Sequence, residues 1–257
     1  MPNGEKYSVS ILICCRNEAG NIDPAVKGIP EMGRHTEIIF IEGGSTDSTR
    51  ETIQRAIAEN AGKRDIKLVL ETADKTSRRS SKGDALRQGF AAATGDILMV
   101  HDGDMTVGPE ELPKFYEAIA SGRGQFINGT RLVTKMDKGA MQFANRIANW
   151  AFGKIFSLLL RQKLTDTLCA DKVLFKKDYD RIVANRKDFG DFDPFGDFDL
   201  LFGAARLGLK IVEVPVHYRE RTYGKTNIHR WSHGVLLVKM CWFAFQKRKL
   251  FKKPTSY

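Results

Sequence analysis

The first half of the chain alternates short apolar segments with segments that carry apolar residues at helical spacing. The apolar segments have the length of buried strands, and turn-forming residues separate them. Such alternation favours a mostly parallel sheet that is covered by helices on both faces. The expected strands are Ser8 to Cys15, Glu37 to Ile41, Ile66 to Leu70, Asp96 to Val100 and Gln125 to Asn128. The expected helices are Ile22 to Ile29, Ser48 to Asn60, Asp84 to Ala93 and Glu110 to Ala120.

The pattern changes after Arg131 to a long helical stretch, in which apolar residues follow the helical period from Phe143 to Leu159. Further expected elements are a strand near Val173 to Phe175, helices around Tyr179 to Ala184 and Asp199 to Arg206, and strands at Lys210 to Val212 and Val216 to Tyr218. No linker or repeat divides the 257 residues. We expect one α/β domain over residues 1–228, followed by a basic amphipathic helix and tail over residues 229–257.

Two aspartates follow the apolar strand that ends at Val100, in the run Asp102-Gly103-Asp104. An open α/β sheet binds ligands in the crevice at the carboxyl ends of its strands. Hard oxygen ligands at that position suit Mg²⁺ or Mn²⁺ that carries a diphosphate. For the tripeptide alone, a solvated Asp-Gly turn is the alternative interpretation.

Two other expected strands end at the same edge of the sheet. The first runs into Arg16-Asn17-Glu18, and the second into Glu42-Gly43-Gly44-Ser45. Paired glycines let the backbone approach a ligand closely, and a carboxylate such as Glu42 accepts hydrogen bonds from a ribose or a base. The Gly-x-Gly-x-x-Gly pattern of dinucleotide-binding enzymes is missing from the first turn, and the phosphate loop of NTPases is missing too, so both classes are disfavoured.

Positive charge is concentrated at the C-terminal end. Residues 217–257 contribute +9 of the formal net charge of +10. These charges flank the apolar run Val235 to Phe245, which is too short to span a bilayer. We expect a helix that lies in the interface of an anionic membrane, with Trp242, Phe243 and Phe245 at the headgroup boundary. A helix that closes the core and ends in a frayed basic tail is the alternative.

The expected location follows from three further features. No zinc-finger or RNA-recognition signature accompanies the charge, so nucleic acid is not an expected partner. The chain opens without a signal peptide, and its four cysteines form neither a disulfide framework nor a metal-binding spacing. We therefore expect a cytoplasmic protein that attaches peripherally to the inner face of the cell membrane.

The ordered set of motifs resembles family 2 glycosyltransferases of the GT-A fold. The resemblance extends to the C-terminal region, which looks like the branch that transfers sugars to polyprenyl phosphates, dolichol-phosphate mannose synthase among them. The motifs are Arg16-Asn17-Glu18, Gly44 to Thr49, Lys82 to Leu86, Asp102-Gly103-Asp104, Gly129-Thr130-Arg131, Asp166 to Cys169, Lys172 to Phe175, Glu213 to Tyr218 and Arg221 to Asn227. The resemblance implies a single GT-A domain with a mostly parallel sheet and C-terminal amphipathic interface helices.

The resemblance also implies a site for a nucleoside-diphosphate sugar and its metal. The implied donor-binding residues are Arg16, Asn17, Glu18, Glu42, Gly44, Ser45, Lys82, Asp102, Gly103 and Asp104. Asp102 and Asp104 are the implied ligands of Mg²⁺ or Mn²⁺. The chain departs from the family pattern at Glu42-Gly43, where two aspartates are usual, and at Ala170-Asp171, where a glycine is often followed by an aromatic or small residue.

Two kinds of acceptor remain open. A lipid phosphate is already anionic and needs arginines, because guanidinium forks bind phosphate in bidentate fashion. The candidates are Arg131, Arg219 and Arg221, with Arg131 and Arg221 favoured by the resemblance. A saccharide hydroxyl needs a carboxylate to take its proton. The candidates are Asp166, Asp197 and Asp199, although Asp166 could orient a lysine or arginine and Asp197 could cap a helix. His101 is expected to pack at the strand end.

We therefore expect an inverting, metal-dependent hexosyltransferase that uses a nucleotide-sugar donor, a polyprenyl-phosphate acceptor and an anionic membrane surface. The expected catalytic residues are Asp102, Asp104, Arg131, Asp166 and Asp199. The first alternative is a glycosyltransferase that acts on a hydroxyl of a saccharide or lipid-linked saccharide. The second is a nucleotide-sugar-binding protein without turnover. A homo-oligomer is compatible with the sequence.

Overall fold

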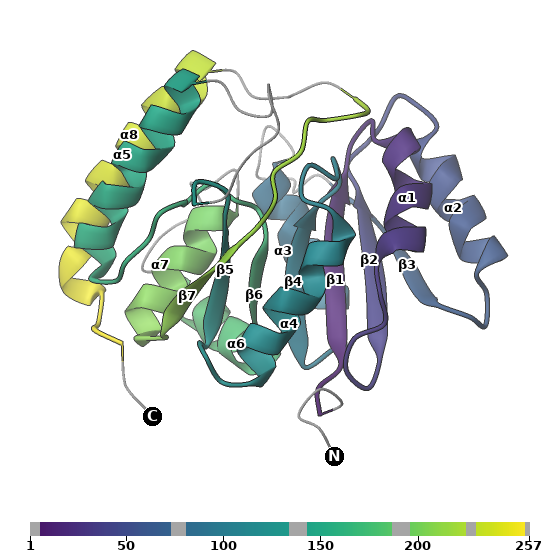
Figure 1. The fold of residues 1–257 in the computed structure, drawn as a ribbon, viewed down its shortest axis with the longest axis horizontal. Coiled ribbons are helices and arrows are strands. Elements are labelled where there is room, and N and C mark those ends of the chain that lie inside the picture. Colours follow the sequence, from purple (N-terminus) through teal and green to yellow (C-terminus); the bar gives the residue numbers. More distant parts are fainter. Residues whose placement is uncertain (1–5, 73–80, 134–142, 187–195, 225–229, 255–257) are drawn as a thin grey trace.

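The computed structural model describes residues 6–72, 81–133, 143–186, 196–224 and 230–254. Within them, seven strands form one sheet in the order β3-β2-β1-β4-β6-β5-β7 (Figure 1). The pairings are parallel except that β6 runs antiparallel to β4 and β5. The strands are β1 (Val9–Cys15), β2 (Thr36–Glu42), β3 (Asp65–Leu70), β4 (Ile97–Asp102), β5 (Phe126–Thr130), β6 (Lys172–Phe175) and β7 (Ile211–Pro215).

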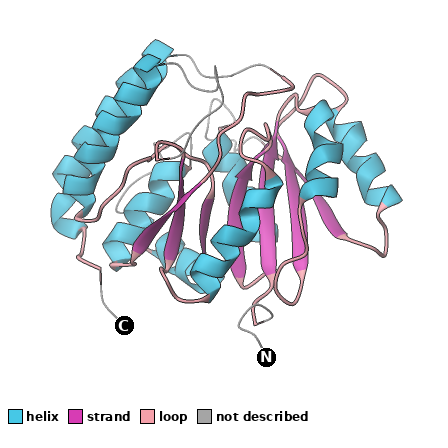
Figure 2. Cartoon of the chain, viewed as in Figure 1, coloured by secondary structure: helices cyan, strands magenta, loops and turns pink. Residues whose placement is uncertain are grey.

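Helices cover both faces of the sheet (Figure 2). Because side chains alternate along a strand, neighbouring residues enter different cores: Ile11 and Ile13 face α1, α2 and α4, whereas Leu12 faces α3, α5, α7 and α8. This burial on both faces explains why the strand sequences are continuously apolar. The helices are α1 (Ala19–Gly28), α2 (Thr49–Glu59), α3 (Lys82–Ala92), α4 (Leu112–Ala120), α5 (Phe143–Leu160), α6 (Lys176–Ala184), α7 (Asp197–Leu207) and α8 (Arg230–Lys247).

The alternation expected in the first half is confirmed, with bounds shifted by up to three residues. The helix expected from Glu110 begins as a 3₁₀ turn (Pro109–Glu111) and becomes α-helical at Leu112. The strand expected at Val216 to Tyr218 is wrong. β7 ends at Pro215 because its partner strand β5 ends at Thr130, whose carbonyl accepts the last ladder hydrogen bond from Val216 N at 3.0 Å. Tyr218 makes an isolated bridge with Val107 instead.

The two helices α5 and α8 lie side by side at one end of the molecule (Figure 1). Leu237, Met240 and Ala244 of α8 are buried in the core, as the alternative interpretation of this helix expected. Phe243, expected at the headgroup boundary, instead packs partly against the core, with its ring 6.1 Å from that of Phe202. In the described part of the chain, no helix has both the length and the apolar content needed to cross a membrane.

Large apolar side chains remain exposed along the outer sides of this helix pair. They are Ile147, Trp150, Ile155 and Leu158 of α5, and Val235, Val238, Trp242 and Phe245 of α8. We call these eight residues the α5–α8 apolar face. The helix pair therefore buries one side in the core and presents hydrophobic surface on the other.

Candidate active site

The run Asp102-Gly103-Asp104 forms a tight turn at the carboxyl end of β4. A Cβ atom on Gly103 would lie 2.6 Å from the carbonyl oxygen of Cys14 in β1, so only glycine fits this close approach. Asp104 Oδ1 accepts hydrogen bonds from Thr106 N at 3.0 Å and Thr106 Oγ1 at 2.7 Å. Met105 adopts a left-handed conformation with φ of 55°. The turn thus holds both carboxylates at the sheet edge predicted for the ligand.

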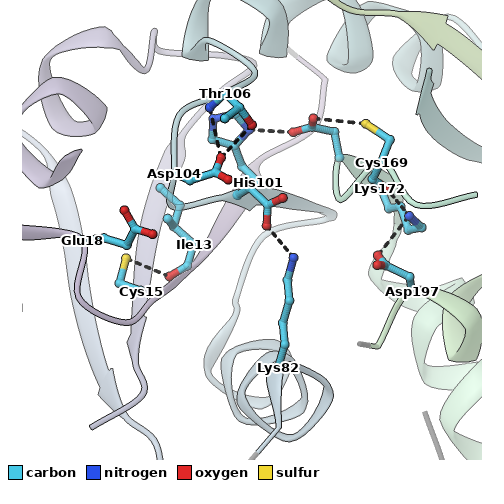
Figure 3. Close-up of polar contacts among 12 residues, drawn as sticks. Ile13, Cys15, Glu18, Lys82, His101, Asp104, Thr106, Cys169, Lys172 and Asp197 are labelled. Atoms are coloured by element: carbon cyan, nitrogen blue, oxygen red, sulfur yellow. Dashed lines mark hydrogen bonds and ion pairs between the residues drawn. The ribbon is translucent and has the colours of Figure 1, made fainter. Parts of the chain in front are cut away.

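Each of these aspartates contacts a cationic side chain. Lys82, at the start of α3, forms an ion pair with Asp102 (Figure 3), and Arg221 Nη2 lies 2.5 Å from Asp104 Oδ2. Burial raises the pKa of Asp102, but the charge and hydrogen bond of Lys82, together with the charges of His101 and Arg131, hold the pKa below the ordinary value. Burial and the neighbouring charge of Asp102 raise the pKa of Asp104. The two carboxylates are therefore close neighbours, and two cations balance them.

The loops after β1 and β2 hold each other in place. Asn17 has φ of 59°, its N–H donates to Ser45 Oγ at 3.0 Å, and its Oδ1 accepts from Thr46 N at 2.8 Å. Glu42 is buried, and its Oε1 accepts a hydrogen bond from Ser45 N at 2.5 Å. Gly44 is left-handed, with φ of 68°, and faces open space. Four of the residues expected to bind the donor therefore build one loop cluster beside the Asp102–Asp104 turn.

Glu18 connects this loop cluster, through Arg221, to Asp104, one of the two candidate metal ligands. Its N–H donates to Thr49 Oγ1 at 2.9 Å, and its carboxylate accepts from Asn21 Nδ2 at 2.6 Å and Arg221 Nη1 at 3.0 Å. Burial raises the pKa of Glu18, although Arg221 opposes the shift. Arg16, also expected at the donor site, is exposed beside this cluster. The Arg221 guanidinium therefore bridges two carboxylates, Glu18 after β1 and Asp104 after β4.

Arg221 belongs to a segment, residues 218–224, that we call the strap. Figure 1 shows the chain crossing here from β7 towards the carboxyl ends of β4 and β1. Arg219 N donates to Thr106 O at 2.8 Å, and Tyr223 Oη donates to Asp47 Oδ2 at 3.3 Å. The Arg219 side chain pairs with Glu110 and is about half exposed, apart from the Glu18–Asp104 cluster that Arg221 joins. Of the two arginines from this segment, the structure brings Arg221 to the site.

Arg131, directly after β5, forms a bidentate pair with Asp166. Its Nε lies 2.7 Å from Oδ2 and its Nη2 lies 2.9 Å from Oδ1. The guanidinium also lies over the Tyr218 ring, 5.1 Å from its centroid. Burial raises the pKa of Asp166, but the charge of Arg131 and the hydrogen bonds from Arg131 and from Leu168 N together hold the pKa below the ordinary value. Asp166 therefore orients an arginine, which is one of the two roles expected from the sequence.

The two aspartates at the start of α7 have different surroundings. Asp199 pairs with Arg186 at 2.8 Å and lies 3.9 Å from Arg87, at a cavity between α3, α6 and α7. Asp197 lies 3.0 Å from Lys172 Nζ, and its charge also acts on Lys82. The structure therefore places Asp197, rather than Asp199, next to the Lys82–Asp102 pair.

A buried polar network lies behind the Asp102–Asp104 turn (Figure 3). His101 Nδ1 lies 2.6 Å from Asp171 Oδ1, and both side chains are almost fully buried. Cys169 Sγ donates a hydrogen bond to Asp171 Oδ2 at 3.5 Å. The backbone carbonyl of Cys169 accepts a hydrogen bond from Lys172 Nζ. His101 thus packs at the strand end, as expected. No local sequence pattern predicts the pairs His101–Asp171 and Lys172–Asp197, because each joins residues that are distant in the chain.

The residues present fit a divalent cation that is shared with a diphosphate. Asp102 and Asp104 could supply two oxygen ligands to such a cation. Each of these carboxylates now pairs with a positive charge, Lys82 or Arg221, so the site balances its negative charge with cations. Among the described residues, no group of three or more His, Cys, Asp or Glu residues could hold a metal by itself. Such a site therefore relies on oxygens of the bound nucleotide to complete the coordination.

Crystal structures of glucosyl-3-phosphoglycerate synthase from Mycobacterium tuberculosis have a similar fold. The complex of that enzyme with Mn²⁺, UDP and phosphoglyceric acid matches with a TM-score of 0.66 and 19% identity, over 98% of this chain and 81% of that one. This similarity confirms the expected GT-A architecture.

Several known proteins are similar in sequence. The chain is 32% identical over 229 residues to a dolichol-phosphate mannosyltransferase from Pyrococcus furiosus. This alignment covers 86% of this chain and 59% of that protein. It is 27% identical over 256 residues to the glycosyltransferase AglD from Haloferax volcanii, and this alignment covers 96% of this chain and 39% of that protein. It is 24% identical over 222 residues to an undecaprenyl-phosphate 4-deoxy-4-formamido-L-arabinose transferase from Edwardsiella ictaluri, and this alignment covers 85% of this chain and 62% of that protein. The chain therefore spans less than two thirds of the length of these relatives.

Residues 10–183 match the family described as Glycosyl transferase family 2. This match covers more than half of the chain and includes both the Asp102–Asp104 turn and the Arg131–Asp166 pair. The chain therefore belongs to glycosyl transferase family 2.

Proposed function

We propose that this protein is an inverting, metal-dependent transferase that moves a hexose from a UDP- or GDP-sugar to a polyprenyl phosphate. The observation that carries the proposal is the cluster at the carboxyl edge of the sheet, where Glu18, Asp102 and Asp104 meet Lys82 and Arg221. The names of the Pyrococcus and Edwardsiella relatives support a polyprenyl-phosphate acceptor. The Mn²⁺ and UDP of the Mycobacterium neighbour support the donor and the metal.

The donor half of the reaction needs stabilisation of the leaving diphosphate. Mg²⁺ or Mn²⁺ held by Asp102 and Asp104 supplies this as a Lewis acid when bound. Lys82 adds a second positive charge, because its pKa stays above the ordinary value despite burial. Glu18 and the loop built by Asn17, Glu42 and Ser45 line the path that the nucleoside takes along the sheet edge.

The surroundings of the candidate bases favour a phosphate acceptor over a hydroxyl acceptor. A hydroxyl needs a carboxylate to take its proton, whereas a phosphate monoester arrives as an anion. Asp166, Asp197 and Asp199 each accept a hydrogen bond or ion pair from an arginine or lysine. Such pairing occupies the oxygens that a general base would need. The guanidinium groups of Arg131 and Arg221 supply the positive charge that an acceptor phosphate needs.

The α5–α8 apolar face and the basic C-terminal residues suit attachment to an anionic membrane. Trp242 is 62% exposed and stacks on Phe245, and Arg248 lies over the Phe245 ring at 4.1 Å. Aromatic side chains next to basic ones are the composition of helices that lie in a lipid interface. In this proposal residues 1–228 form the catalytic domain and residues 229–257 its membrane-docking part.

The donor site is tested by the substitution Asp104→Ala. Isothermal titration of UDP and GDP in the presence of Mn²⁺ should show binding by the wild-type protein that EDTA abolishes. Asp104→Ala should lose this metal-dependent binding, because a single carboxylate remains for the cation. Asp180→Ala, at an exposed position of α6, is the matched control and should bind as the wild type does. Wild-type affinity in Asp104→Ala would remove the proposed metal site.

A further inference from the structure

Glu213 in β7 is a partly buried carboxylate that the proposed reaction does not use. β7 is at the edge of the sheet and pairs with β5, where Glu213 is in register with Asn128. Glu213 Oε1 accepts hydrogen bonds from Thr165 N at 2.7 Å and from Asp166 N at 3.1 Å, and its Oε2 accepts one from Thr165 Oγ1 at 2.8 Å. Three hydrogen bonds from one side chain therefore hold the segment Thr165–Asp166 against β7.

The segment Thr165–Asp166 is also held by β5. Thr165 Oγ1 lies 2.7 Å from Thr130 Oγ1, and Asn128 Nδ2 donates to Asp166 O at 2.7 Å. Thr130 and Asp166 are buried, and hydrogen bonds in such surroundings are stronger than in water. The Thr165 hydroxyl thus connects the Glu213 carboxylate to the last residue of β5.

The position of Asp166 sets the direction of the Arg131 guanidinium. Nε and Nη2 of Arg131 donate to the two oxygens of Asp166 at 2.7 and 2.9 Å, and the backbone N–H of Arg131 donates to Oδ2 at 3.2 Å. A guanidinium is planar and carries its N–H donors in a rigid fork. The donors that point at Asp166 therefore fix the direction of the others. A shift of the Asp166 carboxylate would turn the donors that Arg131 offers to a ligand.

We propose that Glu213 is a positioning residue for acceptor binding, and that it acts through the segment Thr165–Asp166 on Arg131. Its hydrogen bonds keep the Asp166 carboxylate in the place from which Arg131 presents its other donors to the acceptor phosphate. A guanidinium binds phosphate best when two of its donors face two oxygens, so its direction matters as much as its charge. This inference rests on the proposed polyprenyl-phosphate acceptor and names the residue that prepares the binding of its phosphate.

The hydrogen bonds of Glu213, rather than its charge, carry this role. Burial raises the pKa of Glu213 above the ordinary value, despite the hydrogen bonds from Thr165 and Asp166. In Glu213→Gln the amide oxygen can accept from both backbone N–H groups, while the amide NH₂ donates to Thr165 Oγ1. Glu213→Leu removes all three hydrogen bonds. The two variants therefore separate a positioning role from a role of the charge.

The ¹H–¹⁵N spectrum of the arginine Nε–H groups in the full chain measures the orientation of Arg131 directly. The Arg131 signal is assigned by its loss in Arg131→Lys. Glu213→Leu should move this signal and speed the exchange of its proton with water, since the acceptor for Nε–H is no longer held in place. Glu213→Gln should keep the wild-type signal. Thr165→Val, which removes the hydroxyl next to Thr130, should move the signal in the same direction by a smaller amount.

Release of nucleoside diphosphate measures the effect on the acceptor. The assay contains Mn²⁺, a UDP- or GDP-sugar that the wild type consumes, and a short-chain polyprenyl phosphate. Glu213→Leu should raise the KM for the lipid about tenfold or more, because a misdirected guanidinium loses a charge-assisted hydrogen bond. The KM for the donor should stay close to the wild-type value, and Glu213→Gln should behave as the wild type does.

Glu37→Gln is the matched control for a loss of stability. Glu37 is another buried carboxylate with several hydrogen bonds, but it lies near the start of β2, at the opposite end of the strands. Glu37→Gln should lower the stability of the protein without changing the Arg131 signal or the KM for the lipid. An equal rise in the KM for the lipid in this control would overturn the positioning role.

The outcomes distinguish this inference from the proposed function. A wild-type Arg131 signal or an unchanged KM for the lipid in Glu213→Leu would overturn the role of Glu213 and leave the function intact. Equal impairment of Glu213→Gln and Glu213→Leu would do the same. If Glu213→Leu does not fold, Thr165→Val decides by the same two measurements. A folded wild-type protein without lipid-dependent release would overturn the proposed acceptor, and the role of Glu213 in binding it.

Discussion

Arg221 occupies the position between two carboxylates at which a metal-bound nucleotide would be expected. Its guanidinium lies 3.0 Å from Glu18 and 2.5 Å from Asp104. The negative charge of Asp102 is likewise balanced by its ion pair with Lys82. These side chains neutralise the acidic site, so a cation bound to Asp104, as we propose, would compete with Arg221. In this proposal, the strap that carries Arg221 is coupled to metal binding.

Removing the competing guanidinium should strengthen metal binding. Arg221→Gln is expected to tighten Mn²⁺ binding in the absence of nucleotide by about tenfold, since a charge-assisted hydrogen bond to Asp104 no longer has to be broken. Electron paramagnetic resonance of free Mn²⁺ during a titration measures this affinity. Arg219→Gln is the matched control, because Arg219 pairs with Glu110 instead. Unchanged or weaker Mn²⁺ binding by Arg221→Gln would contradict the competition.

Glu37 is a buried carboxylate that acts on stability. It accepts hydrogen bonds from Ser10, Lys67 and both the N–H (3.1 Å) and Oγ1 (2.9 Å) of Thr94. Burial raises the pKa of Glu37, but these donors outweigh it and leave the pKa below the ordinary value. A carboxyl with a depressed pKa stabilises the folded state above its unfolded pKa, and this contribution is lost as pH falls through the folded pKa.

Glu37→Gln should therefore lower the free energy of unfolding by about 1–3 kcal/mol at pH 7. The difference from the wild type should shrink as the pH falls through the range in which carboxyls become protonated. Urea unfolding at a series of pH values measures both effects. Glu59→Gln, which changes a largely exposed side chain, should stay close to the wild type at every pH. A pH-independent difference for Glu37→Gln would show that its charge does not contribute.

At the scale of secondary-structure elements, one face of α8 is buried in the core and the other is exposed. Met240 is fully buried in the core, whereas Trp242, two residues later, is 62% exposed. Burial of Met240 and its neighbours attaches the helix to α5 and α7. Exposure of Trp242 and Phe245 leaves hydrophobic surface next to the basic C-terminal residues.

The two faces should separate in a pair of alanine substitutions. Met240→Ala should lower the free energy of unfolding by about 2–5 kcal/mol, because it leaves a cavity in the core. Trp242→Ala should change stability by less than about 0.5 kcal/mol but weaken sedimentation with anionic liposomes. Urea unfolding and liposome sedimentation of the full chain measure the two effects, with phosphatidylcholine liposomes as the control. Undiminished sedimentation of Trp242→Ala would count against the membrane-docking proposal.

The sequence predicted elements better than the partnerships between them. Apolar runs such as Ile97 to Val100 identify buried strands because burial on both faces leaves a local pattern. The Asp102–Asp104 turn was likewise predictable, since it follows a strand directly. The pairings of His101 with Asp171 and of Asp197 with Lys172 were not, because each joins separate elements. The aspartate preferred from the sequence, Asp199, pairs with Arg186, and no local pattern distinguishes it from Asp197.

At the scale of the whole molecule, one part of the protein carries an acidic sheet edge and another carries an exposed hydrophobic surface. The strap returns the chain from β7 to the edge formed by β1 and β4, so Arg221 joins residues more than 100 positions earlier. The α5–α8 apolar face lies at the other end of the molecule, next to the basic residues Lys247 to Lys253 at the end of α8 and after it. This arrangement suits an enzyme that takes a soluble donor at the sheet edge and an acceptor phosphate from a lipid surface.

Release of nucleoside diphosphate tests transfer to a lipid phosphate most directly. The purified protein is incubated with Mn²⁺ or Mg²⁺, a panel of UDP- and GDP-sugars, and a short-chain polyprenyl phosphate, and release is measured with and without the lipid. We predict that one donor is consumed, that the lipid accelerates release, and that Asp104→Ala abolishes it. Donor binding without lipid-dependent release would contradict the proposed acceptor and direct the search to saccharide hydroxyls.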